Sequence, residues 1–189
     1  MSIQRAAWLI GAVWLAAVLA QSALPLSAAW AVLDGLRHGA AATVAMVWLR
    51  PRWGWAPVVA ATAAGVLIDL DHVVAAGSVD PSAMLGLGVR PLTHSLVAML
   101  AFAGLAGVTA GRISGFAVGA GILLHLEEDA LTWPGVPLLW PLSAEGHVLL
   151  PAPVLVITLI ALVLTSRWLG ASGQQVNPPV ADERSAIEH

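Results

Sequence analysis

Histidine and acidic side chains recur at helical spacing inside stretches of sequence that are otherwise apolar. Asp69 and His72 are three residues apart, so they would share one face of a helix. His125 and Asp129 are four apart and would do the same. Ionisable groups are costly in an apolar environment, and each therefore needs a partner or a function.

Two further histidines, His38 and His94, come from two other apolar stretches. The chain has no cysteine, so any metal must be held by imidazole and carboxylate groups. A single histidine in such a stretch commonly only caps a helix or bonds a carbonyl, but four stretches that converge favour a metal site. We predict one or two divalent cations, with zinc favoured, because zinc needs about three protein ligands and an open position for water.

Arg90 stands directly before Pro91, a residue suited to the first position of a helix. Unpaired backbone N–H groups and a guanidinium would meet there, which is a seat for an anionic group such as a phosphoester. The alternative is that Arg90 only neutralises Asp69 or Asp71, and the two roles could alternate.

Several neighbouring polar residues have simpler interpretations. Glu128 is three residues from His125 and is a candidate to support it, whereas Glu127 would point away and be solvated. Asp34 and Arg37 are three residues apart and could form just an ion pair.

The composition indicates what must position these groups. Of the residues, 59% are hydrophobic and 10% are charged, with a mean hydropathy of +0.85. Soluble domains carry about 25% charged residues, so this chain could not cover a globule with solvated side chains. A net charge of -3 offers no basic patch, and we expect no nucleic-acid partner.

We therefore predict an all-α, polytopic membrane protein with about six transmembrane helices and a polar His/Asp cluster at the outward ends of helices two to five. The first stretch resembles a signal peptide, but we interpret it as a retained helix. Residues 1–169 would form one transmembrane domain, and the polar tail 170–189 would be disordered and cytoplasmic. The expected helices cover residues 6–24, 28–49, 55–75, 91–110, 113–132 and 147–169.

The arginines predict the orientation. With the N-terminus inside, all but Arg37 and Arg90 would lie on the cytoplasmic side, as the positive-inside rule requires. Both termini would then be cytoplasmic and the His/Asp cluster would face outward. The acids that would lie towards the outside are Asp34, Asp69, Asp71, Asp80, Glu127, Glu128, Asp129 and Glu145.

The motifs together resemble the YdjM-like family of bacterial membrane-bound proteins, which are predicted metal-dependent hydrolases of the inner membrane. The resemblance covers roughly residues 38–141, and only the combination of motifs is specific. They are DLDH at 69–72, RPLTHS at 90–95, HLEEDALT at 125–132 and GVPLLWP at 135–141.

The resemblance implies a functional set with Arg90 beside it. The chain departs from the family pattern at Ile68, where Pro is common, and at 89–91, where the family commonly reads His-Arg-Gly and this chain reads Val89-Arg90-Pro91. The implied residues are His38, Asp69, Asp71, His72, His94, His125 and Asp129.

Three functions remain open. The first is a metal-dependent hydrolase acting on a lipid-linked or other phosphoester, with Arg90 binding the anionic group and Asp71 or Glu128 as general base. The second is a metal-binding or transport protein without hydrolysis; the nearly uncharged inner halves of the helices argue against a through-path. The third is a structural or partner-binding membrane protein in which the cluster joins helices.

Overall fold

The computed structural model describes residues 3–25, 27–132 and 134–149. In these ranges the regular elements are all helices, with one isolated antiparallel bridge between Val136 and His147, so the all-α prediction is confirmed there. In chain order the helices are α1 (Ile3–Ser22), α2 (Ala28–Val47), α3 (Arg50–Trp53), α4 (Ala56–Leu67), η1 (Ile68–Leu70), α5 (Asp71–Ala76), α6 (Pro81–Leu85), α7 (Leu96–Ala110) and α8 (Arg112–Ala130).

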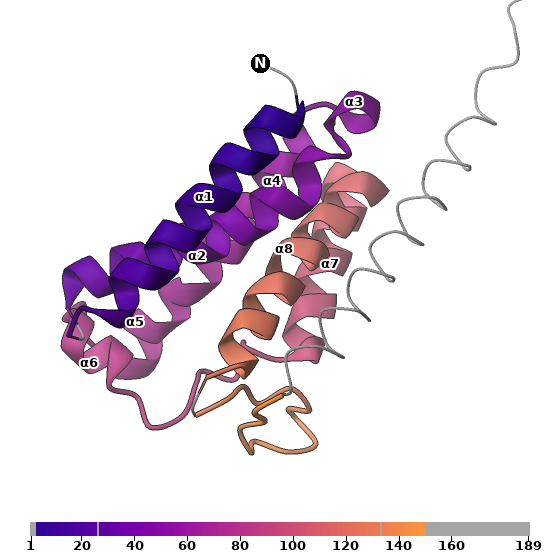
Figure 1. The fold of residues 1–189 in the computed structure, drawn as a ribbon. Helices are drawn as coiled ribbons and strands as arrows, with labels where there is room; N and C mark the ends of the chain where they lie inside the picture. The colour runs from indigo at the N-terminus through magenta and orange to yellow at the C-terminus, as the bar shows by residue number, and fades with distance from the viewer. Residues whose placement is uncertain (1–2, 26, 133, 150–189) are drawn as a thin grey trace, which may run out of the picture.

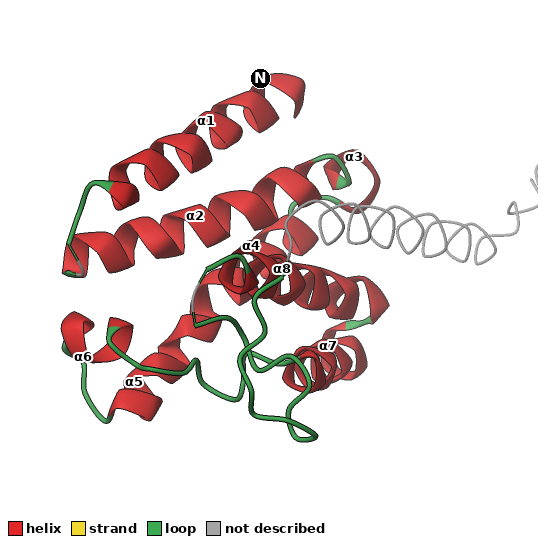
Figure 2. Ribbon diagram, turned by 60° about the horizontal axis from the view of Figure 1, so that its bottom comes forward, coloured by secondary structure: helices red, strands yellow, loops and turns green. Residues whose placement is uncertain are grey.

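The long helices pack as neighbours in an order that differs from the chain order, because α8 lies between α4 and α7 (Figures 1 and 2). α1 lies on α2, α2 on α4, α4 on α8 and α8 on α7, and α2 also contacts α8. α2 begins where Ser27 accepts a hydrogen bond from the backbone N–H of Trp30, a helix cap that follows the break at Pro25. The central position of α2, α4 and α8 brings three of the polar segments together.

Small residues allow α4 and α8 to approach closely. A Cβ atom at Gly65 would lie 3.1 Å from the backbone oxygen of Gly121, and one at Gly121 would overlap the carbonyl of Ala61. Ala42 and Ala117 are fully buried in the same core. Helices in membranes pack through such small residues because lipid supplies little hydrophobic drive for their association.

The third expected helix forms with a change of winding. α4 continues into the short 3₁₀ turn η1 and then into α5, which ends where Gly77 adopts a left-handed conformation with φ of 60°. A 3₁₀ turn winds more tightly than an α-helix, so it rotates the side chains that it carries. Asp69 lies in this turn.

Two expected boundaries are wrong. The fourth helix begins at Leu96, not at Pro91, because Ser95 accepts a hydrogen bond from the Ala98 N–H and takes the cap position. The sixth was expected from His147, but residues 147–149 are not helical and His147 pairs with Val136. The remainder of that expected helix and the tail lie outside the described residues. The connection after Gly77 contains α6, a short helix that lies between the expected helices 55–75 and 91–110.

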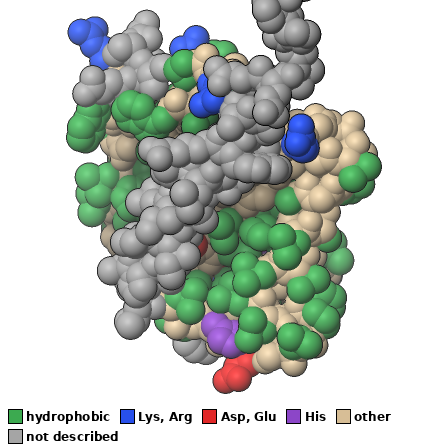
Figure 3. Space-filling view, turned by 90° about the vertical axis from the view of Figure 1, so that its right-hand side faces the viewer, with side chains coloured by type: hydrophobic (Ala, Val, Ile, Leu, Met, Phe, Trp, Pro, Cys, Tyr) green, Lys and Arg blue, Asp and Glu red, His purple; other side chains and the backbone are tan. Residues whose placement is uncertain are grey.

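Two of the described helices are long and apolar enough to span a membrane: Arg5–Ser22 and Ala56–Ala76. Leu96–Ala110 is apolar but shorter. The predicted count of six spans is therefore not confirmed. On the face shown in Figure 3, arginines lie towards one end of the molecule, and a histidine and an acidic side chain lie at the other, with apolar side chains between them.

Candidate metal centre

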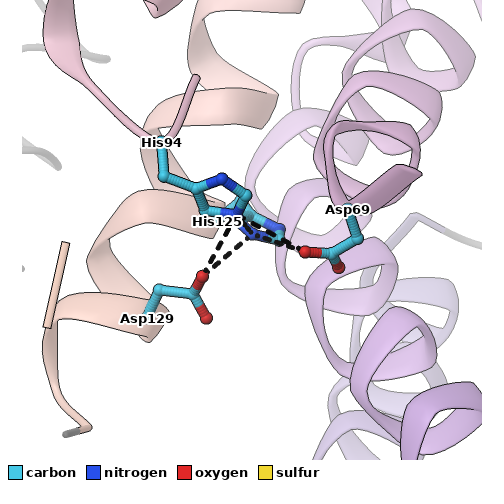
Figure 4. Close-up of side chains that lie close together, drawn as sticks. All are labelled: Asp69, His94, His125 and Asp129. Atoms are coloured by element: carbon cyan, nitrogen blue, oxygen red, sulfur yellow. Dashed lines mark hydrogen bonds and ion pairs between the residues drawn. The ribbon is translucent and has the colours of Figure 1, made fainter. Parts of the chain in front are cut away.

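Three segments bring four ligand side chains to one point (Figure 4). Asp69 comes from η1, His94 from the turn before α7, and His125 and Asp129 from successive turns of α8. His94, His125 and Asp129 are almost completely buried, whereas Asp69 is partly accessible. The i,i+4 spacing on α8 places His125 and Asp129 on one face, as predicted from the sequence.

The four ligand atoms lie at distances suited to a small divalent cation. His94 Nε2 is 3.1 Å from His125 Nε2, and Asp69 Oδ1 is 3.5 Å from the first and 3.3 Å from the second. Asp129 Oδ2 is 3.5 Å from His94 Nε2 and 3.1 Å from His125 Nε2. A tetrahedral site with bonds of about 2.0–2.1 Å has edges of roughly 3.3–3.4 Å, so these residues fit such an ion.

The outer nitrogens of both imidazoles are held so that the inner ones face the site. His125 Nδ1 donates to the carbonyl oxygen of Gly65 at 2.7 Å. His94 Nδ1 lies 3.1 Å from Asp71 Oδ2 and donates to it. Metal-binding histidines are commonly oriented by this pattern, in which the nitrogen that does not bind the metal donates to a carbonyl or carboxylate oxygen.

Asp129 is a buried carboxylate whose oxygens can still accept hydrogen bonds or bind a cation. Its side chain is 1% exposed, and neither of its oxygens accepts a well-formed hydrogen bond from the described residues. Its charge is balanced by Arg90, whose Nη1 lies 2.8 Å from Asp129 Oδ2. A buried charge that is paired but not fully hydrogen-bonded is expected where another cation can bind.

α2 adds a second group beside the first. The ring of His38 stacks on that of His125, with centroids 3.8 Å apart. His38 Nε2 is 3.4 Å from Asp129 Oδ1 and 3.6 Å from Asp34 Oδ1. Asp34, His38 and Asp69 are themselves close enough to hold an ion, so Asp69 and Asp129 lie between the two groups.

Arg37 occupies the centre of this second group. Its Nη2 atom is 2.9 Å from Asp34 Oδ1 and 3.2 Å from His38 Nε2. Its Nη1 atom donates to Gln21 Oε1, and Gln21 Nε2 donates to Asp34 Oδ1. The ion pair between Asp34 and Arg37 is confirmed, but it belongs to the centre instead of standing apart. The sequence predicted the ion pair of Asp34 but not its place in the centre, and it gave no sign of Gln21, because both roles depend on how α1 and α2 pack.

Asp71 and Glu128 hold histidines from outside. Asp71 accepts from the Thr93 hydroxyl as well as from His94, and its Oδ1 is 3.0 Å from His72 Nδ1. The group Asp71, His72 and His94 is a third one that could bind an ion.

Glu128 lies on the α2 side of the centre. Glu128 Oε2 is 2.7 Å from His38 Nδ1, and Glu128 Oε1 accepts from Trp14 Nε1 of α1 at 2.6 Å. Trp14 is a further residue that sequence analysis did not select. A tryptophan in an apolar helix gives no indication of which carboxylate it will meet.

The surroundings of His94 favour its protonated form. Burial by itself lowers the pKa of the imidazole, but hydrogen bonding to the Asp69 and Asp71 carboxylates outweighs burial and raises it from 6.5 to about 9. A proton on Nε2 separates two nitrogen atoms that would otherwise direct lone pairs at each other. A metal ion at this point competes with that proton.

A cavity of about 490 Å³ leads to the centre from the segment between α6 and Arg90. Arg37 and Arg90 line it, together with the carboxylates of Asp34 and Asp69. The cavity gives a small molecule access to the partly exposed side of the metal group, and two guanidinium groups lie in its wall.

The seven predicted ligands, with Arg90 and Glu128, therefore lie in one region. Arg90 neutralises a carboxylate, as one alternative required, but its partner is Asp129 and not Asp69 or Asp71. The prediction that Glu127 is solvated is wrong, since it is 4% exposed. Helix geometry gave its direction relative to His125, but α8 packs between α4 and α7, so that direction does not lead to solvent.

These features define an all-helical protein whose apolar helices enclose a buried His/Asp cluster able to hold a metal ion. A family model described as "YdjM inner membrane protein" matches residues 9–180, and the chain belongs to that family. The family resemblance seen in the motifs is thereby confirmed. Comparison with curated proteins and with solved structures finds no match to the chain.

Proposed function

We propose that this chain is a membrane-embedded, metal-dependent hydrolase that acts on phosphoesters at the extracytoplasmic face of the inner membrane. The observation that carries the proposal is a set of four ligand atoms within 4.8 Å of one another, beside a cavity lined by two arginines. The histidine nitrogens lie 3.1–3.5 Å from each other and from both carboxylate oxygens. Nitrogen and oxygen ligands at tetrahedral spacing favour zinc. One ion would be held by Asp69, His94, His125 and Asp129. The Arg37 guanidinium, 2.9 Å from Asp34 Oδ1 and 3.2 Å from His38 Nε2, already occupies the second group.

Four protein ligands fill a tetrahedral ion, so a coordinated water would need a fifth position; a divalent cation that holds one would supply Lewis acidity and bring the pKa of that water to about 7. Arg90 would bind the anionic group of the substrate. In the described structure Arg90 pairs with Asp129 Oδ2, one of the four ligand atoms. When that oxygen is used for a metal, Arg90 loses much of its partner's charge and becomes available to a phosphoryl oxygen in the cavity.

Proton transfer would fall to a carboxylate of the cavity wall. Asp34 and Asp69 line the cavity, and Asp69 already contributes Oδ1 to the ligand set. Asp34 is therefore the better placed proton acceptor. Asp71 and Glu128, expected to be candidate bases, contact the outer nitrogens of His94 and His38, and we assign them the role of positioning these rings.

The proposed topology has six spans with both termini in the cytoplasm. α2 and α8, with 20 and 19 residues, are about 30 and 28 Å long, close to the hydrocarbon thickness of about 30 Å. The distribution of arginines supports the orientation in which the N-terminus lies in the cytoplasm. The ligand cluster would then lie near the outer boundary, where a substrate can enter sideways from lipid.

Metal content and turnover test the proposal together. Wild type, purified in detergent, should contain zinc in at least stoichiometric amount by elemental analysis and should hydrolyse aryl phosphomonoesters or phosphodiesters. His94→Ala should lose both properties while remaining folded by circular dichroism. Asp80→Asn is the matched control, because Asp80 lies outside the cluster and Asn still caps α6.

The other outcomes identify the alternatives. Stoichiometric metal without turnover of any phosphoester would contradict the hydrolase and favour a metal-binding or transport protein. A folded protein that binds no zinc, manganese or magnesium would contradict both the hydrolase and the metal-binding or transport protein. The cluster would then serve only as a contact between helices.

A further inference from the structure

An apolar groove of about 610 Å³ lies between α1, α2 and α4. Its floor is one face of α2, formed at four-residue spacing by Ala31, Gly35, Gly39 and Thr43. Three of these have little or no side chain, so the surface of α2 is recessed between its neighbours. The groove thus results from the small residues of α2 at regular helical spacing and not from irregular packing of large side chains.

Larger apolar side chains form the walls. Leu9 and Val13 of α1 stand on one side and Val66 of α4 on the other. Leu9 and Val13 are at least half exposed, which leaves the groove open along its length. Nothing in its lining carries a charge.

The inner end of the groove has its polar atoms satisfied. The hydroxyls of Thr43 and Thr62 lie 2.6 Å apart, so one donates to the other, and the second donates to a carbonyl of its own helix, that of Gly39 for Thr43 or Val58 for Thr62. Both threonines therefore present mainly methyl groups to the groove. Such a surface suits hydrocarbon and offers no hydrogen bond to a polar ligand.

The other end meets the metal centre. Ala31 lines both the groove and the polar cavity, and Gly35 of the groove directly follows Asp34 of the cavity. From Ala31 to Thr43 the groove runs about 18 Å along α2 at the helical rise. One leaflet contributes about half of the ~30 Å hydrocarbon core, so the groove matches the chain of a lipid in one leaflet.

We propose that the groove binds one acyl chain of a glycerophospholipid whose phosphodiester enters the cavity beside Arg37 and Arg90. This rests on the proposed hydrolase function and names its substrate class. The apolar lining fits the chain, and the two guanidinium groups fit the anionic headgroup. The length of the groove favours an acyl chain over the longer chain of a polyprenyl phosphate.

Filling the groove tests the inference. A Cβ atom at Gly35 would meet Val66 Cγ1 at 3.7 Å, an ordinary contact, so Gly35→Leu extends into the groove without displacing backbone. Gly11→Leu is the matched control, since a Cβ at Gly11 meets nothing within 4 Å and Gly11 does not line the groove. If Gly35→Leu unfolds, Gly35→Val replaces it.

Two measurements are made on each zinc-loaded variant. The first is kcat/KM for phosphatidylglycerol in mixed micelles and for the soluble diester bis(p-nitrophenyl) phosphate. We expect Gly35→Leu to lose at least about tenfold on the phospholipid, the effect of about two buried methylene groups, and to keep its activity on the soluble diester. The second is native mass spectrometry after extraction from vesicles that contain phosphatidylglycerol and a polyprenyl phosphate. Wild type and Gly11→Leu should retain phospholipid, and Gly35→Leu should not.

Equal phospholipid turnover and retention in Gly35→Leu and wild type would overturn the inference, as would preferential retention of the polyprenyl phosphate by wild type. Hydrolysis of the soluble diester by wild type with no turnover of phospholipid would overturn the inference and leave the proposed function intact. If wild type hydrolyses neither compound and no aryl phosphomonoester, the proposed function fails, and lipid retention alone decides whether the groove binds phospholipid.

Discussion

The Nε2 atoms of His94 and His125 face each other at 3.1 Å in the buried centre of the molecule. The carbonyl of Gly65 and the carboxylate of Asp71 take up the two Nδ1 hydrogens. In their neutral forms the two rings would therefore direct lone pairs at one another. A proton or a metal ion between them removes this repulsion, and the choice between the two has measurable consequences.

Zinc binding should release a proton and weaken as the pH falls. The pKa of His94 is raised to about 9, so at pH 7 its imidazole is protonated and must lose that proton before Nε2 can bind a metal. The apparent affinity should rise at least about tenfold per pH unit between pH 6 and pH 8, since His94 releases one proton for each ion bound and the second imidazole ligand, His125, must also be deprotonated to bind. Competition with a zinc chelator over this pH range measures it.

Calorimetry provides an independent check on the proton. The observed enthalpy of zinc binding should differ between buffers of different ionisation enthalpy, in proportion to the protons released. His147→Asn should behave as wild type, because His147 lies outside the ligand groups. An affinity that does not change between pH 6 and pH 8 would contradict the assignment.

Asp71→Asn should weaken metal binding without removing it. Asp71 does not belong to the four-residue ligand group but accepts from the outer nitrogen of His94. Loss of such an orienting carboxylate typically costs about 10- to 100-fold in metal affinity or activity. Zinc titration of Asp71→Asn beside Asp129→Asn separates the two roles, since Asp129→Asn removes a direct ligand and should bind much less. Equal losses in both variants would argue that Asp71 binds the metal directly.

Arg90→Gln should raise KM for phosphoesters while zinc content and kcat stay close to those of wild type. A hydrogen bond to a charged group contributes about 1.5–3 kcal/mol, which corresponds to roughly 10- to 100-fold in KM. Steady-state kinetics on zinc-loaded protein measures this change. Arg112→Gln, at the opposite end of α8, is the control. An unchanged KM in Arg90→Gln would show that Arg90 serves only to neutralise Asp129.

Gly121→Ala should destabilise the contact between α4 and α8. An added Cβ would overlap the carbonyl of Ala61, and overpacking of this kind costs about 1–3 kcal/mol. Gly104→Ala makes the same chemical change on α7, where a Cβ meets nothing within 4 Å, and should be neutral or slightly stabilising. Thermal unfolding in detergent compares them. Equal melting temperatures would contradict the close approach.

Helical spacing predicted part of the site correctly. His125 and Asp129 share a face because four residues make about one helical turn, whatever surrounds the helix. The same geometry gave the direction of Glu127 but not its burial, which depends on the neighbours of α8. Pro91 was assigned to the first turn of a helix that in fact begins at Leu96, because Ser95 competes more effectively for the cap.

The sequence by itself determined the all-helical class, the apolar character of the chain, its family and the residue types available for metal binding, since these depend on composition and local spacing. Tertiary structure decided which atoms meet. The pairing of His94 with His125, the contact of Arg90 with Asp129 and the inclusion of Asp34 and Gln21 all join residues on different segments. Such contacts depend on how α4 and α8 approach through Gly65 and Gly121, and local spacing carries no information about that distance.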